Sequence, residues 1–118
     1  MPLWEPISGP TIARLSPDFP ALGAASNRCV IVTAPGDAGQ ADFVSRFFGP
    51  AVGIDEDPVT GSAHCALTPY WVERIGRSTL HARQLSARGG RLDCTLNGDR
   101  VVLGGLARTY MHGTVYLD

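Results

Sequence analysis

Residues 55–63 carry the side chains whose types and spacing could do chemistry in this chain. Three carboxylates, Asp55, Glu56 and Asp57, run into a proline, and a Thr-Gly-Ser-Ala step at 60–63 then opens an apolar segment. The first amides of a helix have no partner within the helix, and the helix dipole is positive there. A helix beginning at this step would therefore present an anion pocket, suited to a carboxylate or a phosphate.

The small residues of this step would let a ligand approach the main chain closely. Gly61 has no side chain, Ser62 could add a hydroxyl bond, and Ala63 is too small to block the helix end. The alternative is ordinary N-capping, in which Thr60 or Asp57 satisfies the same amides without any ligand. The sequence leaves both interpretations open, and the candidate substrate-binding residues are Thr60, Gly61, Ser62 and Ala63.

Proton transfer is the chemistry that the neighbouring titratable groups suggest. Asp57 is the carboxylate nearest the helix end, and a bound substrate acid beside it would raise its pKa, which helps a proton-transfer residue. Asp55 and Glu56 are expected to be solvated. His64, in the first helical turn, could act as a base near neutral pH or could be an ordinary packed histidine. The candidate catalytic residues are Asp57 and His64.

Composition excludes several classes of partner. The chain has 118 residues, 10 basic and 11 acidic, without a basic stripe, so nucleic acid is not expected. No apolar run approaches the roughly 20 residues of a membrane span, and the first residues lack the pattern of a signal peptide. The three cysteines are far apart, which predicts free thiols in a reducing cytoplasm and neither a disulfide framework nor a zinc site.

The pattern of elements predicts an α+β fold. Residues 61–75 form an apolar helix, interrupted or kinked at Pro69, and residues 16–25 a short one. Asn97-Gly98-Asp99 marks a hairpin. Strands are expected at 28–34, 42–48, 78–86, 91–96, 100–103 and 107–117. Because the long helix is apolar nearly all round, we expect an antiparallel, barrel-like sheet wrapped around a central helix.

Three stretches of the sequence resemble one protein family. They are FVSRFFGPAVGIDEDPVTGSAHCALTPYW at 43–71, ARQLSARGG at 82–90 and NGDRVVLGG at 97–105. These resemble the C-terminal half of PhzF-like phenazine-biosynthesis proteins, a family similar in fold to diaminopimelate epimerase. The resemblance implies that residues 1–118 form a single domain equivalent to one half of a two-domain fold, whose active site lies between the halves.

The resemblance also implies an activity. Members look like isomerases and epimerases that move a proton on a small carboxylate-bearing molecule without cofactor or metal. By position, Asp57, Gly61, Ser62 and Ala63 would line the substrate pocket. The N-terminal segment with the family's acid/base glutamate is absent from this sequence. Three functions follow: a homodimer of half-sites that catalyses isomerisation, a non-catalytic small-acid-binding or interaction module, or one half of a split enzyme that needs a partner chain.

Overall fold

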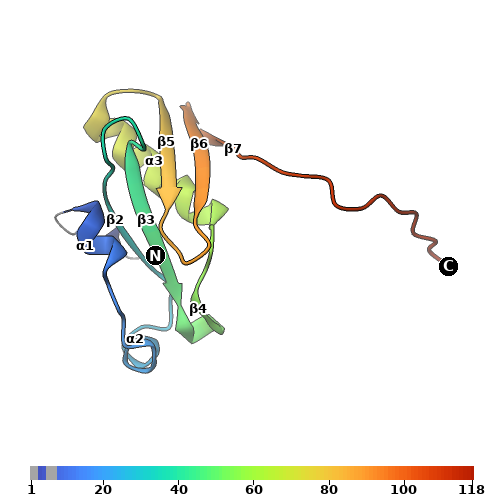
Figure 1. The fold of residues 1–118 in the computed structure, drawn as a ribbon, viewed down its shortest axis with the longest axis horizontal. Helices are drawn as coiled ribbons and strands as arrows, with labels where there is room; N and C mark the ends of the chain where they lie inside the picture. The colour runs from blue at the N-terminus through green and yellow to red at the C-terminus, as the bar shows by residue number, and fades with distance from the viewer. Residues whose placement is uncertain (1–2, 5–7) are drawn as a thin grey trace.

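The structure is a computed structural model that describes residues 3–4 and 8–118, and one mixed sheet organises it (Figure 1). The helices are α1 (Gly9–Ala13), α2 (Phe19–Ala25) and α3 (Gly61–Ile75), with a short 3₁₀ turn, η1, at Pro50–Val52. The strands are β1 (Leu3–Trp4), β2 (Val30–Pro35), β3 (Phe43–Gly49), β4 (Ile54–Glu56), β5 (Thr79–Gln84), β6 (Gly90–Asn97) and β7 (Arg100–Gly104).

The sheet is neither wholly antiparallel nor closed. Its strands follow the order β1-β2-β3-β5-β6-β7, and β4 pairs with β3 beside this path. The β1–β2 and β3–β5 pairs are parallel, and the remaining pairs are antiparallel. The connection from β3 to β5 contains α3, and such a helical crossover brings two strands side by side in parallel. The fold is therefore α+β as expected, but the barrel around a central helix is not confirmed.

Helices cover both faces of the sheet at β3, whose seven residues are all buried. Phe43 and Phe47 pack on the α3 side with Leu67 and Trp71. The alternate residues, such as Val44, face α1 and α2 in a second apolar cluster. A strand that is covered on both faces is a continuous run of buried residues and does not alternate between buried and exposed positions.

Only one side of α3 is buried, which corrects the expectation of a helix enclosed nearly all round. Its buried residues are Ala63, His64, Leu67, Thr68 and Trp71. The opposite side, with Cys65, Ala66 and Pro69, is exposed although most of it is apolar. The helix continues through Pro69 and is not interrupted there, and the hydroxyl of Thr68 donates to the carbonyl of His64.

The remaining sequence predictions divide into two groups. The strands at β2, β3 and β5, the hairpin β6–β7 and the long helix are confirmed. Helix α1 was not expected, although Ser8 caps it and Pro10 stands in its first turn, both of which are signals for a helix start. The expected strand at 107–117 is absent: residues 105–118 run away from the domain in an extended course (Figure 1).

Candidate functional site

The predicted site residues lie together on the loop from β4 into α3. Asp57 follows β4 directly, Thr60 is the residue before the helix, and Gly61 begins it. The main-chain amide of Asp57 donates to the carbonyl of Phe47 at 3.0 Å, which attaches the loop to the end of β3. The structure therefore holds Asp57, Thr60, Gly61 and Ser62 together on this loop and the first turn of α3.

Helix α3 begins without a side-chain cap. Thr60 is in the N-cap position, but its hydroxyl donates to Oδ2 of Asp57 instead of accepting from the first helical turn. Gly61 and Ser62 are exposed, whereas Ala63 is buried. Neither Thr60 nor Asp57 caps the helix with its side chain, which argues against the capping interpretation and leaves the exposed start of the helix as the candidate place for an anion.

Gln84 of β5 holds this loop in place. Its Oε1 accepts from the amide of Thr60 at 2.8 Å, and its Nε2 donates to the carbonyl of Asp57 at 2.9 Å and to the Thr60 hydroxyl at 3.0 Å. Gln84 is 1% exposed, so these bonds are shielded from water. The sequence analysis missed it, although the signal was present: Gln84 occupies the period-two position that Leu80 and Ala82 fill inside β5.

Replacing Gln84 with an apolar residue of similar volume should destabilise the loop at residues 57–60. In Gln84→Leu, the buried amide of Thr60 and carbonyl of Asp57 lose their partners, at about 1–3 kcal/mol for each unsatisfied group. We expect a lower urea midpoint and faster hydrogen exchange at the amide of Thr60. Arg83→Leu, at the neighbouring half-buried residue whose side chain bonds Gln40 and not the loop, is the matched control. Equal exchange at Thr60 in both variants would contradict the positioning role of Gln84.

His64 lies inside the core and not at the surface of the loop. Its side chain is fully buried, and its ring packs 5.9 Å from that of Phe43. Nδ1 lies 2.7 Å from the carbonyl of Thr60, which only accepts, so Nδ1 carries the proton and Nε2 is bare. Nε2 is buried without a partner. This placement argues against the expected base role, because the ring has no open path to a substrate at the loop.

The buried ring makes stability depend on pH. Burial lowers the pKa of His64 below its usual 6.5, and the bond to Thr60 opposes this only in part. The unfolded chain therefore binds a proton on His64 more readily than the folded chain does. The contribution of the neutral His64 to the free energy of unfolding is fully present above about pH 6.5 and is lost as the pH drops below that value. We expect the free energy of unfolding of His64→Gln to fall less steeply with decreasing pH than that of the parent, by up to about 1.4 kcal/mol per pH unit. His112→Asn, in the exposed tail, should change nothing in the same denaturation series.

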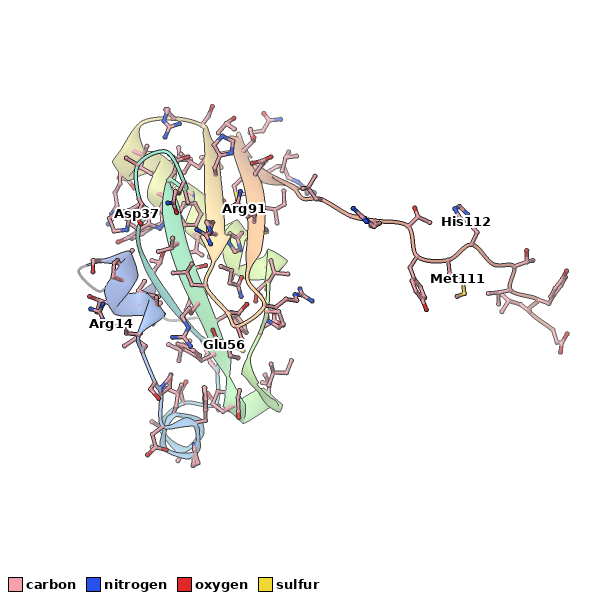
Figure 2. The ribbon with its side chains drawn as sticks, in the orientation of Figure 1. Arg14, Asp37, Glu56, Arg91, Met111 and His112 are labelled. Carbon is pink, nitrogen blue, oxygen red and sulfur yellow. The ribbon has the colours of Figure 1, made fainter. Side chains whose placement is uncertain are left out.

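Glu56 is not solvated, contrary to expectation, but forms a two-bond ion pair with Arg46. Nε and Nη2 of Arg46 lie 2.8 and 2.7 Å from the two Glu56 carboxylate oxygens. Nη1 of Arg46 also donates to the carbonyls of Ile12 and Leu15, and the Arg46 side chain is 10% exposed. Glu56 lies beside the start of the loop (Figure 2), so this pair ties the loop to α1. Asp55, by contrast, is exposed as expected.

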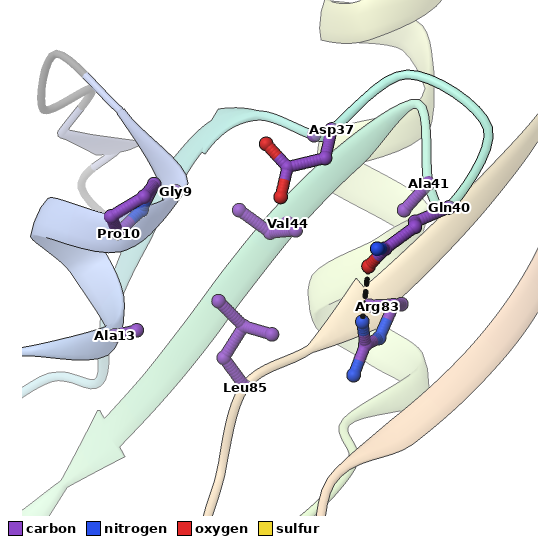
Figure 3. A pocket seen from close by; sticks show the side chains of 10 residues that line it. Gly9, Pro10, Ala13, Asp37, Gln40, Ala41, Val44, Arg83 and Leu85 are labelled. Carbon is purple, nitrogen blue, oxygen red and sulfur yellow. Dashed lines mark hydrogen bonds between the residues drawn. The ribbon is translucent and has the colours of Figure 1, made fainter.

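A small cavity of about 190 Å³ lies elsewhere in the domain (Figure 3). It opens between α1, the β2–β3 loop and β5, where Arg83 donates to Gln40 at 3.2 Å. Val44 and Leu85 line it, and both belong to the cluster under α1 and α2. The cavity is therefore on the face of the sheet opposite α3 and takes no part in the site at Asp57.

No group of three or more His, Cys, Asp or Glu side chains within residues 3–4 and 8–118 could hold a metal ion. No helix in this part of the chain is long and apolar enough to cross a membrane. Cys29, Cys65 and Cys94 are free thiols.

Comparison with known proteins places this geometry in a family. The family model described as phenazine biosynthesis-like protein matches residues 6–113. An uncharacterised isomerase of Pseudomonas aeruginosa is 54% identical over 107 residues, which are 91% of this chain and 40% of that protein. A human phenazine biosynthesis-like domain-containing protein is 49% identical over 83 residues, 69% of this chain and 29% of its own.

Solved structures agree. A crystal structure of a PhzF-family phenazine biosynthesis protein from Enterococcus faecalis superposes with a TM-score of 0.86 at 46% identity, covering 98% of this chain and 44% of that one. A putative PhzC/PhzF protein from Clostridium difficile gives 0.84 at 38% identity. The chain thus spans less than half the length of these relatives. With the family model matched over residues 6–113, the chain belongs to the phenazine biosynthesis-like family.

Proposed function

We propose that this chain forms one wall of an isomerase active site that moves a proton on a small carboxylate-bearing molecule without a cofactor. The substrate carboxylate binds the uncapped amides at the start of α3, with the Ser62 hydroxyl beside them. Asp57 takes a proton from substrate carbon or returns one, so that the reaction shifts a hydrogen and no electrons are gained or lost overall. His64 stays outside this proposal because of its burial.

The observation that carries the proposal is the bond from Thr60 to Asp57. The hydroxyl that should cap α3 is used to hold the carboxylate, and Gln84 fixes both residues from behind. One oxygen of Asp57, Oδ1, then has no partner within the described residues, and it lies beside a helix end that attracts anions. A loop built only to start a helix would use the Thr60 oxygen as the cap.

One wall is not a closed site, and we propose that a second polypeptide surface completes it. The exposed apolar side of α3 and the open sheet support association, because water-exposed apolar surface favours a partner. A homodimer of half-sites is one source of the second wall, and a separate partner chain is the other. In either assembly, added strands would complete the barrel around α3. Three free thiols are consistent with the cytoplasm as the location.

A non-catalytic small-acid binder is the second candidate. It is favoured by the titratable groups on the loop, since Asp57 stands there without a second acid or base while Glu56 is neutralised by Arg46. A proton shift between two positions of a substrate commonly needs a group that donates a proton as well as one that accepts it. In this case the same amides would bind a carboxylate that is then released unchanged.

Solvent deuterium distinguishes the two functions. The purified chain, at concentrations spanning its self-association in sedimentation equilibrium, is incubated in D₂O with a dihydro-hydroxyanthranilate, a small carboxylate-bearing molecule of the class that the family resemblance implies. Protein-dependent deuterium on substrate carbon, followed by NMR, supports the isomerase. Binding seen in the same NMR samples without exchange, in an assembly that contains both walls, supports the binder and overturns the isomerase.

A further inference from the structure

The cavity between α1 and the sheet combines an apolar lining with three polar side chains (Figure 3). Val44 and Leu85 belong to the apolar lining, and Asp37, Gln40 and Arg83 supply the polar groups. Asp37 and Gln40 are exposed and Arg83 is half-buried, so solvent reaches the polar groups, whereas Val44 is buried in an apolar cluster. Small-molecule sites usually have such apolar walls and a few polar groups that fix the orientation of the ligand.

Asp37 and Arg83 bring opposite charges to this cavity without pairing with each other. Asp37 lies on the loop between β2 and β3, and Arg83 lies on β5. In the part of the chain that the structure describes, the ion pairs involve Arg46, Arg77 and His81, so neither Asp37 nor Arg83 has a countercharge there. Two opposite charges that line one cavity and stay apart are complementary to a small molecule that carries both charges.

The position of Arg83 in the sheet favours a carboxylate beside it. Arg83 is directly opposite Arg91 in the antiparallel pairing of β5 with β6, and like charges directly opposite each other destabilise a sheet. Its Nη1 donates to Oε1 of Gln40 at 3.2 Å, and because this amide is neutral the positive charge stays uncompensated. A planar guanidinium can hold a carboxylate through two parallel hydrogen bonds, so a ligand carboxylate would supply the missing countercharge.

Main-chain hydrogen bonds hold the loop that carries Asp37. The amide of Gln40 donates to the carbonyl of Asp37 at 3.0 Å, and the amide of Gly36 donates to the carbonyl of Asp42 at 3.0 Å. The amide of Asp42 donates in turn to the carbonyl of His81 at 2.7 Å, which attaches the loop to β5. The two charged walls of the cavity are therefore positioned before a ligand binds, which lowers the entropy cost of binding.

We propose that this cavity binds a small apolar amino acid. The ligand carboxylate pairs with Arg83, its ammonium group pairs with Asp37, and its side chain packs on Val44 and Leu85. The cavity volume of about 190 Å³ suits this class of ligand, since a cavity of about 150 Å³ holds benzene. The cavity is on the face of the sheet opposite α3, so this inference goes beyond the proposed isomerase function and does not depend on it.

Titration of the full chain with L-leucine, followed by NMR of the main-chain amides, tests the proposal. We expect saturable shifts at Gly36, Gln40 and Leu85. Isocaproate is leucine without its ammonium group, and isoamylamine is leucine without its carboxylate. Each analogue should bind at least about 10-fold more weakly than leucine, because one charge-assisted contact is lost. Shifts confined to residues 61–63 would place leucine at the start of α3 and overturn the proposal.

Two charge-removing variants assign the contacts. Asp37→Asn and Arg83→Gln should each weaken leucine binding at least about 10-fold. Asp37→Asn should also bind leucine and isocaproate equally, and Arg83→Gln should bind leucine and isoamylamine equally, which a merely structural role would not produce. Asp99→Asn and Arg100→Gln, in the exposed β6–β7 hairpin, are the matched controls and should stay within about 2-fold of the parent.

Three further results would overturn the proposal. The first is the absence of saturable shifts with leucine, valine and methionine at concentrations up to about 50 mM, which covers the affinity expected for ligands of this size. The second is equal binding of leucine and its two analogues by the parent chain. The third is leucine binding that survives both Asp37→Asn and Arg83→Gln.

Discussion

Replacing Arg46 with methionine is expected to lower the free energy of unfolding by about 3–5 kcal/mol, the range typical of breaking a buried ion pair. The guanidinium donates to both carboxylate oxygens of Glu56 and to the carbonyls of Ile12 and Leu15. Removing it leaves a mostly buried carboxylate without its countercharge and takes one donor from each of two carbonyls, of which that of Ile12 keeps the amide of Leu15. Urea unfolding measures the loss as a lower midpoint at constant slope.

Two further variants test the cause. Arg91→Met removes an exposed arginine from β6 and should stay within about 0.5 kcal/mol of the parent. The double variant Arg46→Met/Glu56→Gln should recover part of the loss, because the unpaired carboxylate is gone while the two carbonyls still lack the guanidinium donor. A loss below about 1 kcal/mol for Arg46→Met alone would mean that water solvates this pair as it solvates a surface salt bridge.

Asp57→Asn should lower the rate of proton exchange about 10²- to 10⁴-fold, the usual contribution of a general acid or base. Asparagine keeps an oxygen for the Thr60 hydroxyl, and the bond from Gln84 reaches the main chain of residue 57, so the loop should keep its shape. Removing the negative charge also removes repulsion of a substrate carboxylate. The variant should therefore bind the substrate at least as tightly while exchanging its proton more slowly.

Asp55→Asn is the matched control for this prediction. Asp55 stands two residues earlier, carries the same charge and is exposed. Its replacement should leave both the rate and the affinity within about 2-fold. Deuterium incorporation followed by NMR gives the rate, and titration of the same samples gives the affinity. Equal rates for the parent and Asp57→Asn would remove Asp57 from the chemistry, whatever the affinities are.

The sequence by itself determined the local elements and the position of the candidate site. Asn97-Gly98 fixed the β6–β7 hairpin, because few residue pairs accept a tight turn so readily. The apolar run from Gly61 and the glycine at 76, which takes a left-handed φ of 83°, set the bounds of α3. These are short-range preferences of neighbouring residues, which a linear pattern records faithfully.

Tertiary structure decided which residues hold and complete that site. Gln84 is 24 residues from Thr60 in the chain, and Arg46 is 10 from Glu56, so their bonds depend on strand pairing and on which face each side chain takes. His64 looked available beside the small loop, but the turn of α3 directs it into the core, where burial favours its neutral form.

The sheet and the C-terminal residues 105–118 show the same limit of prediction from the sequence. Whether a strand-like segment becomes a strand depends on a neighbour that supplies hydrogen-bond partners, and residues 107–117 have none in the described part of this chain. The apolar circumference of α3 predicted enclosure for the same reason: it records every surface that the helix can bury, including those that only another polypeptide could cover. The sequence pattern thus indicates which contacts each segment can make. The tertiary structure decides which of those contacts form within this chain.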